Sequence, residues 1–194
     1  MPRPLPPPGP AHERRSADAA PPPRLPIGEM MLVPLSVFHA RQICDWRYPS
    51  PYERFNWPAW ADMVRSGSDF GDRRVRRRQF AAIVDPWGGL LGFAQFFPLV
   101  GVLRLGLGLH PELCSRGLGA RFVRLIADEA RRRAPGEQID LEVLTWNTRA
   151  IRAYERAGFC ITDTYERDST HGRAQFHCMV YLPEHGPGQP PLEA

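Results

Sequence analysis

A short loop that contains two glycines lies directly before an amphipathic stretch and could hold a phosphate group. Gly117 and Gly119 stand at the start of a helix that we predict over residues 117–133. The first amides of a helix have no partner within it, and the helix dipole is positive there, so backbone N–H groups could bind a diphosphate. A helix start with permissive glycines is also common in folds that bind nothing. The spacing alone leaves both interpretations open.

Two other kinds of nucleotide site are disfavoured by the sequence. Gly106-Leu107-Gly108 is followed by Leu109-His110-Pro111 and lacks the third glycine of a dinucleotide-binding turn. All 25 basic residues are arginine, and the absence of lysine excludes a P-loop, a lysine Schiff base and a lysine-dependent kinase site. A diphosphate at this loop would therefore be held mainly by the backbone, with Arg116 adding charge.

The elements that must position this loop alternate between strands and helices. Hydrophobic patterns predict strands over residues 30–37, 79–84, 90–97, 100–109, 139–145, 160–168 and 173–182. Capping residues and apolar stripes predict helices over residues 38–46, from Asn56 to about Gly67, over 117–133 and from Asn147 to Gly158. Residues 66–78, with five arginines, are predicted to be a solvated polar loop. The order β-α-α-β-β-β-α-β-α-β-β predicts an α/β fold with a mixed, mostly antiparallel central sheet flanked by helices.

Composition divides the chain into a tail and one domain. Ten of the 22 prolines lie in residues 1–26, which predicts a disordered tail followed by a single domain over residues 27–182 and a flexible tail over residues 183–194. The formal net charge of +4 does not indicate a general nucleic-acid binder. No apolar run is long enough to span a membrane, and no signal peptide is visible. The four cysteines are far apart in the sequence. A cytoplasmic protein with free thiols is expected.

Two stretches of the sequence resemble the GCN5-related N-acetyltransferase (GNAT) superfamily. They are residues 107–120, LGLHPELCSRGLGA, and residues 141–159, LEVLTWNTRAIRAYERAGF. The resemblance implies that the ligand is CoA and that its pyrophosphate is bound by Cys114, Ser115, Arg116, Gly117, Leu118, Gly119 and Ala120. The family usually has Gln or Arg at the position of Cys114.

The resemblance also implies a gap in the sheet. The strand that ends at Leu109 would separate from the next strand, so that the Leu107 N–H polarises the thioester carbonyl and Leu109 bonds the pantetheine arm. Without the neighbouring motif, both leucines would be ordinary strand core.

Tyr154 and Glu142 are the candidates for the two proton transfers. A phenol can protonate a departing thiolate, and the alternative for Tyr154 is a tyrosine packed under its helix. The arrangement of Glu142, Asn147 and Tyr154 is similar to that of bacterial ribosomal-protein N-terminal acetyltransferases, which implies a general base at Glu142 and places Asn147 in the cofactor site. The alternative for Glu142 is a sheet carboxylate paired with arginine.

An aromatic segment lies between the first two predicted helices, which border the acceptor site in this family. Its candidate substrate-binding residues are Trp46, Tyr48, Tyr52 and Glu53, the last of which could attract an amine. Such aromatic residues could equally pack the helices onto the sheet.

The resulting prediction is an N-acetyltransferase that moves acetyl from acetyl-CoA, its cosubstrate, to a primary amine by direct attack. No metal, no nucleic acid and no membrane partner is expected, and a homodimer is left open. The amine is a peptide N-terminus or a small amine, between which the sequence does not decide. The alternative is a non-catalytic acyl-CoA-binding regulatory module.

Overall fold

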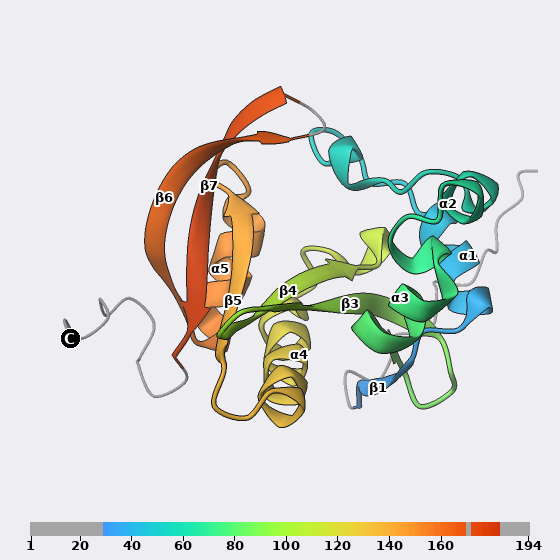
Figure 1. Cartoon of the computed structure of the whole chain (residues 1–194), viewed down its shortest axis with the longest axis horizontal. Coiled ribbons are helices and arrows are strands. Elements are labelled where there is room, and N and C mark those ends of the chain that lie inside the picture. The colour runs from blue at the N-terminus through green and yellow to red at the C-terminus, as the bar shows by residue number, and fades with distance from the viewer. Residues whose placement is uncertain (1–28, 170–171, 183–194) are drawn as a thin grey trace, which may run out of the picture.

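Seven strands form one mixed sheet in the order β1-β2-β3-β4-β5-β7-β6 (Figure 1). The computed structural model describes residues 29–169 and 172–182. The strands are β1 (Met31–Pro34), β2 (Phe80–Val84), β3 (Leu90–Leu99), β4 (Val102–Leu109), β5 (Gln138–Leu144), β6 (Phe159–Ser169) and β7 (Gly172–Tyr181). The α-helices are α1 (Val37–Asp45), α2 (Trp60–Ser66), α3 (Arg73–Gln79), α4 (Gly119–Arg133) and α5 (Thr148–Ala157). The expected α/β fold class is confirmed.

The sheet is antiparallel except where β4 lies beside β5. These two strands pair in parallel from Val102 opposite Gln138 to Leu105 opposite Leu141. Beyond Leu105, β4 continues to Leu109 along β3 but no longer pairs with β5, and the two strands diverge (Figure 1). The predicted gap in the sheet is therefore present.

Two hydrophobic cores hold the helices to opposite faces of the sheet. The larger core joins α4 and α5 to the central strands, with Phe122 and Ile126 of α4 fully buried against Leu141 of β5. The smaller core packs α1 and α2 on the first strands and includes Ile43 and Met63. In Figure 1, α1, α2 and α3 gather at the β1–β3 end of the sheet, away from the β6–β7 hairpin. The helices thus leave the second face uncovered near β5.

Local contacts shape the β2–β3 hairpin and the last helix. The Asp85 carboxylate accepts hydrogen bonds from the backbone N–H groups of Trp87 and Gly89, at 2.9 and 2.8 Å, and so closes the β2–β3 hairpin. Helix α5 begins after Asn147 and ends at Gly158, which has a φ of 108°. A positive φ at a helix end suits glycine because it has no Cβ.

The polar segment before β2 differs from its prediction. Residues 66–78 are not a loop, because Arg73–Gln79 forms α3, and Asp72 caps it by accepting a hydrogen bond from the Val75 N–H at 2.8 Å. Arg76 is buried and donates to the carbonyl of Phe70 at 2.6 Å, with its guanidinium over the Trp60 ring. The number of arginines predicted a solvated loop. In the structure, one of the five arginine side chains is buried and anchors the helix.

The second helix also begins later than predicted. Asn56 does not cap it; α2 starts at Trp60 after Ala59, and Glu53–Phe55 forms a separate 3₁₀ turn. The Asn56 side chain instead accepts a hydrogen bond from the Tyr48 N–H at 2.8 Å. A tertiary contact therefore uses the polar side chain that the sequence assigned to a cap.

The two predicted tails fall on residues that lie outside the described ranges. Within residues 29–169 and 172–182, none of the helices is long and apolar enough to cross a membrane.

The buried arginine gives a first prediction. Arg76→Ala should lower the free energy of unfolding by about 2 kcal/mol, because the charged hydrogen bond to Phe70 and the contact with Trp60 are lost together. Arg77→Ala, an exposed position on the same helix, should change it by less than about 0.5 kcal/mol. Urea unfolding of both variants measures the difference, and equal values would show that the burial of Arg76 does not stabilise the fold.

Candidate active site

The diverging edge of β4 carries backbone groups without a strand partner. The His110 N–H donates to the Leu91 carbonyl at 2.8 Å, so by strand alternation Gly106 and Gly108 bond β3 while Leu107 and Leu109 face the other side. That side is the one from which β5 has moved away. The Leu107 and Leu109 amides therefore point into the gap between β4 and β5, as the sequence motif implied.

One polar group on this edge already has a partner. The Tyr48 hydroxyl donates to the Leu109 carbonyl at 2.8 Å, across 61 positions of sequence. Tyr48 is buried, and burial raises the pKa of its phenol, with Cys114 and Tyr154 adding to the shift and Arg149 opposing it. Tyr48 thus ties the segment after α1 to the end of β4 and stays protonated.

The loop before α4 has the conformation expected of an anion site. Ser115 and Gly117 have φ values of 62° and 80°. No side chain caps α4 at Leu118, and its first turn holds no acidic residue. The first amides of α4 are therefore available to a diphosphate, and the loop of residues 114–120 fits the CoA group that the sequence implied.

The two glycines of this loop have different tasks. A Cβ on Gly117 would meet nothing within 4 Å, so glycine is required there by its backbone angle. A Cβ on Gly119 would lie 2.9 Å from the Ala153 Cβ. Gly119 therefore lets α4 and α5 approach each other.

Tyr154 lies on α5 among groups that face the gap. Burial raises the pKa of its phenol to about 12, against the opposing effect of Arg149. Arg149, five residues earlier on α5, also acts electrostatically on Tyr48 and Cys114, so these four side chains lie near one another. Burial likewise raises the pKa of the Cys114 thiol. The phenol can donate a proton over the whole neutral range, and the thiol is not an activated nucleophile.

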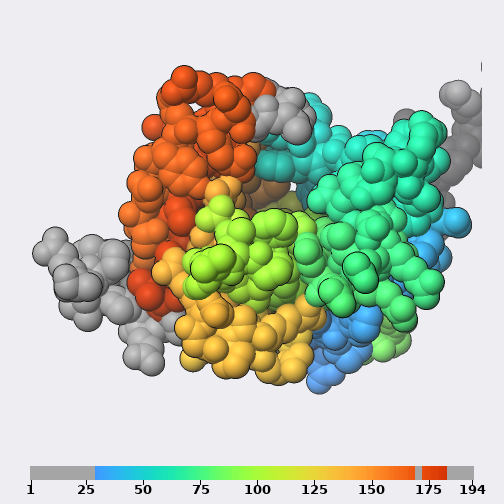
Figure 2. Space-filling view, viewed as in Figure 1, coloured from blue at the N-terminus to red at the C-terminus, as the bar shows by residue number. Residues whose placement is uncertain are grey.

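An aromatic bridge closes the outer side of this cluster. Tyr52 and Phe55 lie 5.5 and 6.1 Å, between ring centroids, from Trp146 in the turn after β5, and Arg149 lies 3.9 Å above the Tyr52 ring. Figure 2 shows a hollow in the surface beside the orange β6–β7 hairpin and the cyan segment after α1. The bridge connects two walls of the gap, and Phe55 and Trp146 are more than a third exposed.

The predicted substrate-binding residues separate into two groups. Tyr48 and Tyr52 contact the gap as described, whereas Trp46 is buried against Phe93 and the edge of His110. Glu53 is exposed at the start of the 3₁₀ turn. Packing of the sheet thus accounts for Trp46, and an amine contact of Glu53 stays a prediction.

Glu142 is engaged on both carboxylate oxygens. Its Oε1 accepts from Arg104 and from the Tyr165 hydroxyl, each at 2.5 Å, and its Oε2 accepts from Arg167 at 2.6 Å. Arg104 also forms two hydrogen bonds with the buried Asp140, at 3.0 and 2.6 Å. Donors on both oxygens leave the carboxylate no free position toward an amine, which favours the arginine-paired alternative over a general base. Proton acceptance by Glu142 stays a prediction.

Asn147 has a local partner that accounts for its burial. Its side chain accepts from the Ala150 N–H at 3.3 Å and so starts α5, the helix that carries Tyr154. Sequence reasoning missed Arg149 and Trp146 because their partners Tyr52 and Phe55 come from a distant segment. Their positions just after β5, at the mouth of the expected gap, are the only signal that could have pointed to them.

The parted strands beside an uncapped helix define an acyl-CoA-binding fold of the kind that the two sequence motifs resemble. A model of the acetyltransferase (GNAT) family matches residues 40–159, which is more than half of the chain. The chain therefore belongs to the acetyltransferase (GNAT) family and is an acetyltransferase, in a family that uses acetyl-CoA as cosubstrate.

Solved structures of two kinds of N-acetyltransferase share the fold. A chimera of the Vibrio cholerae spermidine N-acetyltransferase SpeG with hSSAT has a TM-score of 0.63 and 15% identity, covering 79% of this chain and 96% of that one. The ribosomal-protein-S18-alanine N-acetyltransferase of Escherichia coli has a TM-score of 0.54 and 20% identity, covering 84% and 99%. No curated protein matches the chain at a significant level. These identities establish the fold and leave the acceptor open.

The loop before α4 gives a second prediction. Gly117→Asp should weaken CoA binding by well over tenfold, about 1.4 kcal/mol for each decade, because it puts a carboxylate where the diphosphate binds. Gly136→Asp is a matched control, since Gly136 also has a positive φ, 87°, and open space around its Cβ position, but follows the far end of α4. Calorimetric titration with CoA measures both. Equal affinities in the two folded variants would remove the loop from the cofactor site.

Proposed function

We propose that this chain transfers an acetyl group from acetyl-CoA to a primary amine by direct attack. The amine nitrogen attacks the thioester carbonyl carbon, and the C–S bond breaks. The thiolate takes a proton from the enzyme, and the amine nitrogen releases one to water, from which the enzyme acid is protonated again. The parted edge of β4, together with the partly buried phenol of Tyr154, carries this proposal. A thioester placed in the gap would have a backbone donor at its carbonyl and an acid at its sulfur.

The backbone of β4 would stabilise the negative charge of the reaction. The Leu107 N–H would bind the carbonyl oxygen as charge develops there, and the Leu109 N–H would bind the pantetheine arm. Because Tyr48 already occupies the Leu109 carbonyl, that residue offers the arm its N–H alone. The protonated Cys114 thiol supports direct attack over a cysteine-bound intermediate.

Tyr154 is the acid that we assign to the leaving thiolate. Its pKa, raised to about 12, keeps it protonated throughout the physiological range, and a thiol near 8.5 is the stronger acid of the pair. Proton transfer from the phenol to the thiolate is therefore uphill by itself and is driven by the collapse of the tetrahedral intermediate.

The acceptor is a peptide N-terminus or a small amine. Access to the gap passes the aromatic bridge, whose exposed faces at Phe55 and Trp146 suit an apolar group next to the reacting nitrogen. A non-catalytic acyl-CoA-binding module remains the second candidate. The presence of both Tyr154 and the free β4 edge favours turnover.

An acceptor screen that detects released CoA thiol tests the transfer, and a tyrosine variant gives its third prediction. With any good acceptor, Tyr154→Phe should lower kcat by about 10²–10⁴ while acetyl-CoA affinity stays unchanged, because only the acidic hydroxyl is lost. Tyr181→Phe is the control, since its hydroxyl donates to the exposed carboxylate of Asp128 on α4. Full activity in Tyr154→Phe would exclude this phenol as the acid. Acetyl-CoA binding without acceptor-dependent CoA release would favour the module.

The ion pairs of Glu142 generate a fourth prediction, on the dependence of rate on pH. If Glu142 accepts the amine proton, Glu142→Gln should lose most activity below the pKa of the acceptor amine, about 8 for a peptide N-terminus and about 10 for an alkylamine, and least above it, where free amine is already present. The engagement of both its oxygens leads us to expect parallel profiles of kcat/KM from pH 6 to about 10 and a less stable protein instead. A selective loss at neutral pH would restore Glu142 as the general base.

A further inference from the structure

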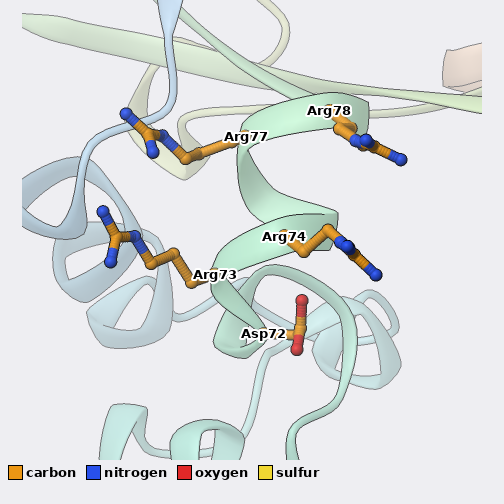
Figure 3. A pocket seen from close by; sticks show the side chains of 5 residues that line it. All are labelled: Asp72, Arg73, Arg74, Arg77 and Arg78. Carbon is orange, nitrogen blue, oxygen red and sulfur yellow. The ribbon is translucent and has the colours of Figure 1, made fainter.

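Helix α3 presents four exposed arginines around an open hollow of about 560 Å³. This arginine hollow is lined by Asp72, Arg73, Arg74, Arg77 and Arg78 (Figure 3). In Figure 3, Arg73 and Arg77 lie on one side of the helix, and Arg74 and Arg78 lie on the other. Among the described residues, none of these four guanidinium groups forms an ion pair with a carboxylate.

This arrangement concentrates positive charge in a way that the fold itself does not require. Like charges four positions apart destabilise a helix, and here two such pairs stand side by side. Arg73 and Arg77 add to the effect of burial in lowering the pKa of Arg76. The single acid of the hollow, Asp72, accepts the capping hydrogen bond from Val75. Only Arg76 of the helix's five arginines anchors it, so the other four are free to bind an external group.

Guanidinium groups in paired rows suit one ligand chemistry. Each guanidinium offers a planar fork of N–H donors that matches a carboxylate or a phosphate. Two rows of arginine, one on each side of α3, therefore match several acidic groups in succession better than one isolated ion.

The arginine hollow is connected to the acceptor side of the gap. Gln79, the last residue of α3, accepts a hydrogen bond from Gln95 at 3.2 Å. Gln95 pairs with Gly106, the first residue of β4 beyond its pairing with β5, and a Cβ on Gly106 would lie 3.3 Å from the Gln95 Oε1. An extended chain covers about 3.3–3.6 Å per residue, so a peptide with its amine in the gap can run from Gly106 past Gln95 toward α3.

Charge then separates the acceptor classes. A polyamine would place further positive charge beside four unpaired guanidinium groups, and a small amine would not reach them. We infer that the acceptor is a polypeptide whose N-terminal segment carries acidic side chains a few residues after the reacting amine, and that the arginine hollow binds them. This inference rests on the proposed amine acetylation.

Peptide acceptors that differ only in charge test the inference with the full chain. Three peptides share their first two residues and then carry a run of Glu, Gln or Lys. We expect kcat/KM to fall in that order, by roughly tenfold from the Glu to the Lys peptide. The difference should lie in KM and not in kcat, and it should become smaller at high salt. Arg74→Gln/Arg78→Gln and Arg73→Gln/Arg77→Gln should reduce the preference, and Arg131→Gln/Arg132→Gln, which removes equal charge from α4, should keep it.

Binding of a fluorescent, N-terminally acetylated Glu peptide gives a readout that needs no turnover. We expect anisotropy to show tighter binding of this peptide to the wild-type chain than to either α3 variant, with urea midpoints unchanged. Two outcomes would overturn the inference. One is equal kcat/KM for the three peptides, and the other is a preference for the Glu peptide that persists in both α3 variants.

Binding of a single-stranded oligonucleotide through α3 without any peptide preference would overturn it in favour of nucleic acid. Failure of the proposed function is distinct, since no peptide and no small amine would then release CoA.

Discussion

The separation of β4 from β5 after Leu105 is the feature on which the rest of the structure depends. A parallel pair that stops after four residues leaves two strand ends with unpaired backbone groups, which are costly unless something else binds them. Tyr48 satisfies one of these groups, the Leu109 carbonyl. The amides of Leu107 and Leu109 remain, and their need for a partner is what makes the gap a binding site.

The elements around the gap are arranged so that it stays open. Helices α4 and α5 pack on one face, and Gly119 against Ala153 lets them come close enough to bring the loop before α4 next to the strand ends. On the other face, the chain after α1 crosses to Trp146 through Tyr52 and Phe55. Packing on both faces of the sheet thus keeps β4 and β5 apart, and the backbone amides in the gap can bind a ligand.

Electrostatics divides the acceptor side into two regions of different character. Around β5, Arg104 and Arg167 are neutralised by Asp140 and Glu142 in one connected network. On α3, four guanidinium groups have no such partners among the described residues. The same residue type therefore stabilises the sheet in one place and leaves a net positive surface in the other, because the one carboxylate that lines the hollow of α3, Asp72, caps the helix.

The sequence by itself determined the features that depend on neighbours in the chain. The Asp85 turn, the Asn147 cap, the positive φ of Gly158 and the glycine loop before α4 are local events, and the order of strands and helices followed from periodicity. Tertiary structure decided which partners the charged and aromatic side chains have, since the charge or polarity of a residue does not determine whether it faces the core or the solvent. It turned Arg76 inward, gave Glu142 two arginines and a tyrosine, and brought Arg149 and Trp146 to Tyr52. These contacts join residues from separate segments, and their energies exist only after the sheet has formed.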